Sequence, residues 1–188
     1  AASTEKMNKT LCRALYPPLQ LAISNGLSVY GVCLNGFKGF LRWQTQTNTY
    51  FGQEISDRVR VIACLTTLPN MVHSDSPGET LTSSEWQKVK KALNASNDDT
   101  LVIVWGPEED ARLGAQEVII RAHEATIGVP SETRQALKDG TNGFERILPG
   151  PDRMYPDTDL PPKRVTAQRL EKIRASLPPR ITTRESWY

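Results

Sequence analysis

The stretch "TLVIVWGPEEDARLGAQEVIIRAHEATIG", residues 100–128, decides the fold. Residues 101–105 are five consecutive apolar side chains, most of them β-branched or aromatic, which predicts a buried strand. Gly106 and Pro107 end that strand and start a long helix, with proline at the first helical position and three acidic residues, 108–110, near the positive end of the helix dipole. A strand that leads directly into such a helix is typical of helices packed on a sheet.

The helix that begins near Pro107 is predicted to pack closely against this sheet. Small apolar residues recur along one face at spacings of four and three, at positions 111, 115, 118, 122 and 125. Glu117 and Arg121 stand four residues apart, and we expect them to form an ion pair on the outside of the helix.

Other segments carry clear local signals. Thr82 and Glu85 have the spacing of a capping box, which predicts a helix from Thr82 to about residue 94. Pro17 and Pro18 interrupt the helical pattern of residues 8–26, so two short helices are expected there. The remaining expected elements are strands over residues 27–34, 70–75 and 144–148 and helices over residues 52–65 and 166–177. Up to residue 128, this alternation by itself indicates a parallel α/β sheet.

The composition is that of an ordinary globular protein. With 188 residues and 38% hydrophobic content, the chain is long enough for one generous core, or one domain with a smaller appendage. Its apolar runs are far shorter than the roughly 20 residues needed to span a bilayer, so no membrane segment is expected. The first ten residues lack the apolar stretch of a signal peptide, and a cytoplasmic location is expected.

The three cysteines and two histidines indicate no metal site. Cys12, Cys33 and Cys64 are odd in number, widely separated and surrounded by apolar neighbours, so we expect buried free thiols. His73 and His123 have no ligand spacing that joins them to these cysteines.

The sequence "HSD", residues 73–75, contains the residue types of a hydrolase triad. On an extended backbone, however, Ser74 would face away from His73 and Asp75. We therefore expect Asp75 to stabilise a turn.

The C-terminal part of the chain is basic and rich in proline. Residues 163–185 contain seven basic and two acidic side chains, which is compatible with phosphate contacts or with a solvated helix face. Five prolines stiffen residues 149–162 and hold Asp157 and Asp159 two positions apart. Two such carboxylates could share a Mg²⁺ ion with a phosphate. The alternative is a surface turn in which they bind local amides or Arg153.

The motifs after residue 128 resemble a known family. Glu-Thr-Arg at 132–134, Phe-x-Arg followed by Leu-Pro-Gly at 144–150, and "RMYPDTDLPP" at 153–162 occur in this order in the E subunits of archaeal-type glutamyl-tRNA(Gln) amidotransferases. The preceding stretch is similar to the domain inserted in those subunits and shared with bacterial aspartyl-tRNA synthetases, through "LNGFKGF", "FGQEISDRV", "HSD" and "VWGPEEDA". The resemblance covers nearly the whole chain.

The resemblance implies a fold that differs from the parallel α/β sheet indicated by the alternation of helices and strands. It implies an α+β, two-layer inserted domain with an antiparallel sheet backed by helices, then an irregular proline-rich segment and one helix. A strand or two would then be missing from the interpretation of residues 36–69. The implied division is residues 1–128 for the inserted domain, 129–162 for a segment that returns to the catalytic cradle of the larger subunit, and 163–188 for the start of a helical region.

The resemblance also implies a function. The complete subunit converts Glu-tRNA(Gln) to Gln-tRNA(Gln), using ATP, Mg²⁺ and ammonia from an asparaginase-type partner. We expect no catalytic residue, metal ligand or cofactor in the present chain, although whether it acts alone as an enzyme stays open. The alternative is a noncatalytic RNA- or protein-docking module of the synthetase-insertion type. The residues implied to lie near the substrate are Glu132, Arg134, Arg146, Arg153, Tyr155, Asp157 and Asp159.

Overall fold

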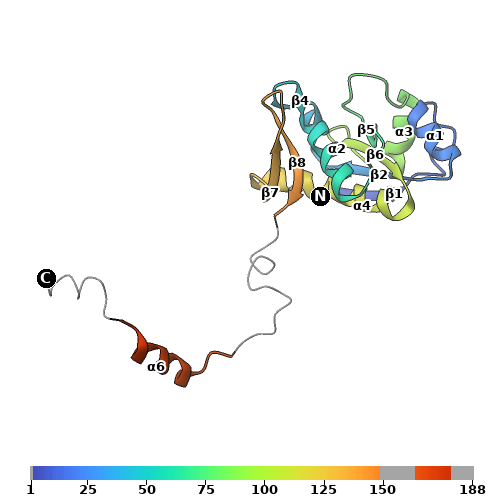
Figure 1. Ribbon diagram of the computed structural model, residues 1–188. Coiled ribbons are helices and arrows are strands. Elements are labelled where there is room, and N and C mark those ends of the chain that lie inside the picture. The colour runs from blue at the N-terminus through green and yellow to red at the C-terminus, as the bar shows by residue number, and fades with distance from the viewer. Residues whose placement is uncertain (1, 149–163, 179–188) are drawn as a thin grey trace. The chain divides into compact units, whose positions relative to one another are not determined.

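The computed structural model describes residues 2–148 and 164–178 (Figure 1). The chain divides into two compact units, Ala1–Leu148 and Pro149–Tyr188. The first unit contains the sheets and most of the helices, and the second contributes one described helix.

The centre of the first unit is a four-stranded antiparallel sheet. Its strand order is β1 (Ala2–Lys6), β2 (Ser28–Leu34), β6 (Thr100–Gly106) and β5 (Met71–His73). In the central pair, Ser28 lies opposite Gly106 and Leu34 lies opposite Thr100. The predicted α+β class with an antiparallel sheet is confirmed, and the parallel α/β sheet indicated by the alternation is wrong. The prediction from the alternation is wrong because β2 and β5 are not neighbours. Each pairs antiparallel with β6, which lies between them.

Helices cover both faces of this sheet (Figure 1). Alternate residues of β6 enter two separate apolar clusters: Leu101, Ile103 and Trp105 belong to one, and Val102 and Val104 to the other. The first cluster lies under α1 (Pro17–Ser24) and α3 (Ser83–Ala92). The second lies under α2 (Phe51–Ile62) and α4 (Glu108–Ile127), which also pack against each other.

The elements with strong local signals form as predicted. The capping box of α3 is confirmed, because Thr82 Oγ1 accepts from the Glu85 N–H at 3.3 Å and Glu85 Oε2 accepts from the Thr82 N–H at 2.8 Å. The strands β2, β5 and β6 and the helix α2 lie where the sequence predicts them, within a few residues. Pro107 is the N-cap of α4 and not its first helical residue.

The first 26 residues differ from the prediction. Residues 8–13 form turns, and only α1 is helical. Pro17 and Pro18 occupy the first two positions of α1, where a missing N–H donor costs no helical hydrogen bond. The strand β1 was not predicted because all five of its side chains are exposed and carry no apolar alternation.

Residues 36–69 contain two further strands, as expected, but these strands do not join the main sheet. After the short 3₁₀ helix η1 (Phe40–Arg42), β3 (Gln44–Gln46) and β4 (Thr49–Tyr50) form a small antiparallel hairpin. This hairpin is a separate sheet, so the antiparallel character of the main sheet arises from β1, β2, β5 and β6.

A second hairpin, β7 (Glu132–Ala136) and β8 (Asn142–Ile147), packs against α2 in the same compact unit. The strand predicted at residues 144–148 is confirmed as part of β8, whereas β7 was not predicted. Phe144 is the buried residue of this hairpin. The boundaries at 128/129 and 162/163 stay predictions about the larger protein.

The helix predicted near residue 166 is confirmed as α6 (Ala167–Ser176). Thr166 is its N-cap, and its Oγ1 accepts from the Arg169 N–H at 3.3 Å. The side chains of α6 are exposed.

The cysteines are free thiols, as expected, but only Cys33 is buried. Burial raises the pKa of Cys33 to about 11, which keeps this thiol protonated and unreactive. Cys12 and Cys64 are exposed, so the prediction of burial is wrong for both. Cys12 lies in the N-terminal turns, and Cys64 follows α2 with a left-handed φ of 56°. Within residues 2–148 and 164–178, no helix combines the length and the apolar character that crossing a membrane requires.

Candidate functional site

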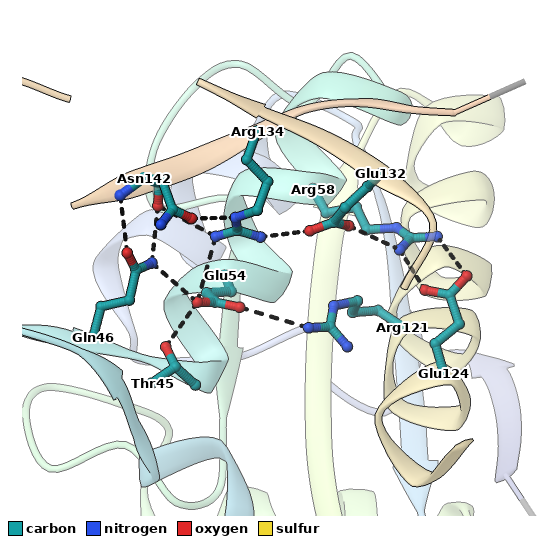
Figure 2. A network of polar contacts seen from close by, with 9 residues as sticks. All are labelled: Thr45, Gln46, Glu54, Arg58, Arg121, Glu124, Glu132, Arg134 and Asn142. Atoms are coloured by element: carbon teal, nitrogen blue, oxygen red, sulfur yellow. Dashed lines mark hydrogen bonds and ion pairs between the residues drawn. The ribbon is translucent and has the colours of Figure 1, made fainter. Parts of the chain in front are cut away.

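A cleft of about 870 Å³ lies between the η1 loop, the start of α2, the end of α4 and the β7–β8 hairpin. Three aromatic residues of the loop, Phe37, Phe40 and Trp43, line it together with Phe51 of α2. Its charged lining consists of Glu54, Arg121, Glu132 and Arg134. These charged residues belong to a polar network that continues beneath the hairpin (Figure 2).

Arg58 of α2 is the most buried member of this network, with 2% of its side chain exposed. Its Nε lies 3.0 Å from Oε2 of Glu117, and its Nη1 lies 2.5 Å from Oε2 of Glu124 on the same helix, α4. A third carboxylate, that of Glu132 on β7, lies 3.5 Å from Nη1. The guanidinium also stands over the Phe144 ring, 5.7 Å from its centroid. One side chain therefore joins α2, α4 and both strands of the hairpin.

The surroundings of Arg58 favour its charged form. Burial alone would lower the pKa of this guanidinium, but hydrogen bonds to Glu124 and Glu117 act in the opposite direction and raise the pKa overall. Since arginine stays charged under all ordinary conditions, the network keeps a permanent buried cation.

Glu54 of α2 is the corresponding buried acceptor on the cleft side. Arg121 Nη2 lies 3.6 Å from Oε2 of Glu54, and Arg134 Nη2 lies 3.5 Å from Oε1. Thr45 Oγ1 donates to Oε1 at 2.7 Å, and Gln46 Nε2 donates to the same oxygen at 3.3 Å. The carboxylate is thus held by donors from β3, α4 and β7 (Figure 2).

The two hairpins are joined by paired amide contacts. The Asn142 N–H donates to Gln46 Oε1 at 2.9 Å, and Gln46 Nε2 donates to the Asn142 carbonyl at 2.9 Å. Arg134 Nη1 lies 2.5 Å from Glu132 Oε1, and Arg134 Nε donates to the side-chain oxygen of Asn142. The wall of the cleft formed by β7–β8 is therefore fixed to the β3–β4 hairpin by side chains as well as by packing.

This arrangement is suited to binding. Each carboxylate that lines the cleft is engaged by a guanidinium, so neither Glu54 nor Glu132 is presented as a free general base. By contrast, Arg121 Nη1 is buried and finds no hydrogen-bond acceptor among the described residues. The lining thus combines an aromatic wall with a buried donor, Arg121 Nη1, and a buried acceptor, Glu132 Oε2, that make no hydrogen bond among the described residues.

The structure brings two of the predicted site residues together. Glu132 and Arg134 both lie in the cleft and contact each other. Arg146 is exposed on β8 opposite Thr133, and Thr133 lies between Glu132 and Arg134 on β7. Arg146 is not among the residues that line the cleft. The remaining four residues lie outside the described residues: Arg153, Tyr155, Asp157 and Asp159. Their placement near a substrate stays a prediction.

The helical half of the network was not predicted from the sequence. The prediction of an exposed Glu117–Arg121 pair is wrong, because both residues are buried and bind partners on α2. The sequence contains a signal, since Glu54 and Arg58 have the same i,i+4 spacing as Glu117 and Arg121. Only the packing of α2 against α4 shows that the acid of each helix pairs with the arginine of the other.

The residues 73–75 stabilise the backbone around β5. Ser74 Oγ accepts from the Leu101 N–H at 3.0 Å, and Asp75 Oδ2 accepts from the Gly39 N–H at 2.9 Å and from Thr100 Oγ1 at 3.0 Å. These contacts agree with the expected structural role of Asp75.

The described residues offer no cluster of metal ligands. In residues 2–148 and 164–178, no group of three or more His, Cys, Asp or Glu side chains could hold a metal ion. The buried arginines that could bind phosphate are already paired with glutamates, with Arg58 alone contacting three of them.

Comparison with known proteins places the sheet and the cleft in a family. The model of the GAD domain matches residues 19–112, which include β2, β5, β6 and the aromatic loop. The E subunit of glutamyl-tRNA(Gln) amidotransferase from Pyrococcus furiosus is 41% identical over 157 residues, 83% of this chain and 24% of that protein. The E subunit from Methanocaldococcus jannaschii is 40% identical over 168 residues, 89% of this chain and 26% of that protein.

The similarity extends beyond the GAD domain. The E subunit from Sulfurisphaera tokodaii is 38% identical over 176 residues, 93% of this chain and 27% of that protein, so this match also takes in the β7–β8 hairpin. The chain spans about a quarter of the length of the curated relatives it matches. The resemblance to the E subunits, drawn from the sequence motifs, is confirmed. The chain therefore belongs to the GAD domain family, and over most of its length it corresponds to a segment of the glutamyl-tRNA(Gln) amidotransferase E subunits.

Proposed function

We propose that this chain is a noncatalytic segment of a tRNA-dependent amidotransferase subunit. The complete subunit would convert Glu-tRNA(Gln) to Gln-tRNA(Gln) in the cytoplasm, using ATP and ammonia from an asparaginase-type partner. The observation that carries this proposal is the 41% identity to a protein named for that activity, over 83% of this chain.

The buried network supports a positioning role for the segment. Arg58 contacts Glu117 and Glu124 on α4 and Glu132 on β7, so the β7–β8 hairpin is held against the inserted domain by charges that are protected from solvent. The residues after Leu148 would continue from this fixed hairpin toward the rest of the subunit. In this proposal, residues 1–128 form the inserted domain, 129–162 return to the cradle and 163–188 begin the helical region.

ATP and Mg²⁺ would be bound mainly by parts of the subunit other than the described residues. In support, Arg58 and Arg134 are already paired with glutamates and are not free to bind a nucleotide phosphate chain. The seven basic residues of 163–185 are suited to contact the phosphates of tRNA(Gln). The seven residues expected near the substrate, from Glu132 to Asp159, stay part of this proposal.

A docking role for the segment is favoured by the cleft itself. Trp43 is 65% exposed and Phe40 is 43% exposed, although both are large aromatic residues. Exposed aromatic residues that line one cleft mark a surface for a partner. This observation adds to the first proposal, because a noncatalytic segment of an amidotransferase can also be a docking platform.

The test is a chimera in which this chain replaces the matching segment of a relative. The part of the Pyrococcus furiosus protein that matches this chain is replaced by the chain, and formation of Gln-tRNA(Gln) from Glu-tRNA(Gln) is measured with the ammonia-supplying partner present. We expect ATP-dependent amidation by the chimera and none by the chain alone. A folded chimera that binds its partner and tRNA but forms no Gln-tRNA(Gln) would contradict the proposal.

A further inference from the structure

The aromatic wall of the cleft is built from one short loop. The Phe37 and Phe40 rings have centroids 5.7 Å apart, and Phe40 and Trp43 follow with centroids 5.6 Å apart and an interplanar angle of 30°. The exposed parts of Phe40 and Trp43 offer flat π surfaces that the domain itself does not cover. A neighbouring flat ring could continue this series by stacking.

The same loop carries positive charge between its aromatic residues. In the sequence "GFKGFLRW", residues 36–43, Lys38 and Arg42 alternate with the rings, and both side chains are exposed. Within the described part of the chain neither forms an ion pair, whereas Arg58 and Arg134 are paired with glutamates. Aromatic side chains for bases together with cations for the phosphate backbone are the two components of a surface for single-stranded nucleic acid.

On the polar side of the cleft, one arginine nitrogen makes no hydrogen bond among the described residues. Arg121 is nine-tenths buried, its Nη2 lies near Glu54 at 3.6 Å, and its guanidinium stands 4.9 Å from the centroid of the Phe51 ring. Arg121 lines the cleft, and its buried Nη1 has no acceptor among the described residues. A buried donor without an acceptor is costly, so an incoming acceptor would be bound favourably there. Oε2 of Glu54, beside it, is contacted among the described residues only by Arg121, at 3.6 Å, and can accept a further hydrogen bond.

We propose that this cleft binds unpaired nucleobases of RNA, stacked on Trp43 and Phe40 and contacted at their edges by Arg121 and Glu54. Base edges carry both acceptors and donors, which matches an arginine next to a carboxylate. The volume of about 870 Å³ is within the usual range for small-molecule sites, about 300–1,000 Å³. The choice of RNA as partner rests on the proposed function. The contacting residues, and the requirement that the bases be unpaired, are inferred from the geometry of the cleft.

Unpaired bases fit better than a duplex or a protein segment. In a duplex the bases are stacked on each other, and stacking on a protein ring requires them to be separated. An apolar protein segment would leave Arg121 Nη1 without an acceptor and would gain nothing from Lys38 and Arg42. The charges of the loop and the cleft therefore favour the nucleic acid.

The test measures binding of the 188-residue chain to labelled single-stranded oligoadenylate and oligouridylate at low salt by fluorescence anisotropy. Trp43→Ala should weaken binding by about fivefold or more, the lower end of the contribution of one base stacked on one ring. Tyr50→Ala is the matched control, since Tyr50 is 49% exposed and lies outside the cleft lining. It should bind like the unaltered chain. Blunt RNA duplex should compete poorly at equal phosphate concentration.

A second variant addresses the buried donor. Arg121→Lys keeps the charge but loses the planar pair of donors, so it should weaken single-strand binding while the circular dichroism spectrum stays unchanged. If it does not fold, Trp43→Ala alone decides the question, because Trp43 is exposed.

Three results would overturn the proposal: no binding by the unaltered chain, equal competition by duplex RNA, or equal affinities for Trp43→Ala and Tyr50→Ala. In the first case a protein partner is the remaining occupant of the cleft. Each of these results can coincide with amidation by the chimera, so failure of this inference is distinguishable from failure of the proposed function.

Discussion

The guanidinium of Arg58 on α2 lies 3.0 Å from Oε2 of Glu117 on α4, and both side chains are more than nine-tenths buried. Two helices on the same face of the sheet are therefore joined by a buried ion pair as well as by apolar contacts. The same arginine contacts Glu124 and Glu132, so this relationship also fixes the hairpin that forms one wall of the cleft.

Arg58→Ala should strongly destabilise the domain. Removing the cation leaves buried carboxylates without compensation, which costs about 3–5 kcal/mol in comparable sites. Arg112→Ala is the control, because Arg112 is half exposed and its i,i+3 contact with Glu109 is a surface ion pair that contributes little to stability. Urea unfolding of both variants measures the difference. Equal free energies of unfolding would show that the buried pair contributes no more than a surface pair.

Arg134→Ala should loosen the β7–β8 hairpin while the main sheet stays intact. Arg134 contacts Glu54, Glu132 and Asn142, and losing charge-assisted contacts of about 1.4 kcal/mol should speed local amide exchange about tenfold. Hydrogen–deuterium exchange of residues 132–147 is the measurement. Arg146→Ala is the control, because Arg146 is exposed and lies outside the cleft lining, and it should leave exchange unchanged. The prediction is wrong if both variants exchange alike.

Mild acid should destabilise the fold through His73. Burial, the largest influence, and nearby Arg42 lower the pKa of this imidazole, while Asp75 acts to raise it, and the net direction is down. The unfolded state, with a pKa of about 6.5, then takes up the proton first as the pH falls. The contribution of neutral His73 is complete above about pH 6.5 and decreases below it.

The measurement compares urea unfolding at pH 7.5 and pH 5.5. The free energy of unfolding should fall at the lower pH, and it should fall less in His73→Gln, which removes only this titration. A fall of the same size in the variant would assign the pH dependence to other groups.

Gly52→Ala should destabilise α2 although alanine is the better helix former. A Cβ at Gly52 would lie 2.7 Å from His73 Nε2 and 3.1 Å from the Leu41 carbonyl oxygen. Overpacking of this kind costs about 1–3 kcal/mol. Most of that range exceeds the gain of about 1 kcal/mol in helix propensity that alanine brings over glycine. Gly78→Ala is the control, since no atom lies within 4 Å of its Cβ position. Thermal unfolding should show a lower midpoint only for Gly52→Ala.

Sequence predicted the elements whose signals are local. The apolar run of β6 and the Thr82–Glu85 capping box each lie within a few residues, and both formed as expected. The edge strand β1 was not predictable in this way, because its side chains are exposed and its only reason to be a strand is pairing with β2. Likewise, the alternation of helices and strands does not say which strands become neighbours.

The candidate site was predictable only in part. Motif resemblance identified Glu132 and Arg134, which lie together in the cleft. Their helical partners Glu54, Arg58 and Arg121 were missed, because a charged i,i+4 pair looks the same in sequence whether it faces solvent or another helix. Contacts between α2 and α4 are long-range, so only the fold shows that these charges are buried.

The most direct measurement of the central claim, that this chain is a noncatalytic segment that supports tRNA binding, is calorimetric titration of the chain with tRNA(Gln) and with ATP·Mg²⁺ at low salt. We expect weak binding of tRNA(Gln) that decreases as salt is added, because basic residues of 163–185 would release counterions from the phosphates. We expect no measurable heat of nucleotide binding. Tight, saturable binding of ATP·Mg²⁺ by this chain would contradict the account.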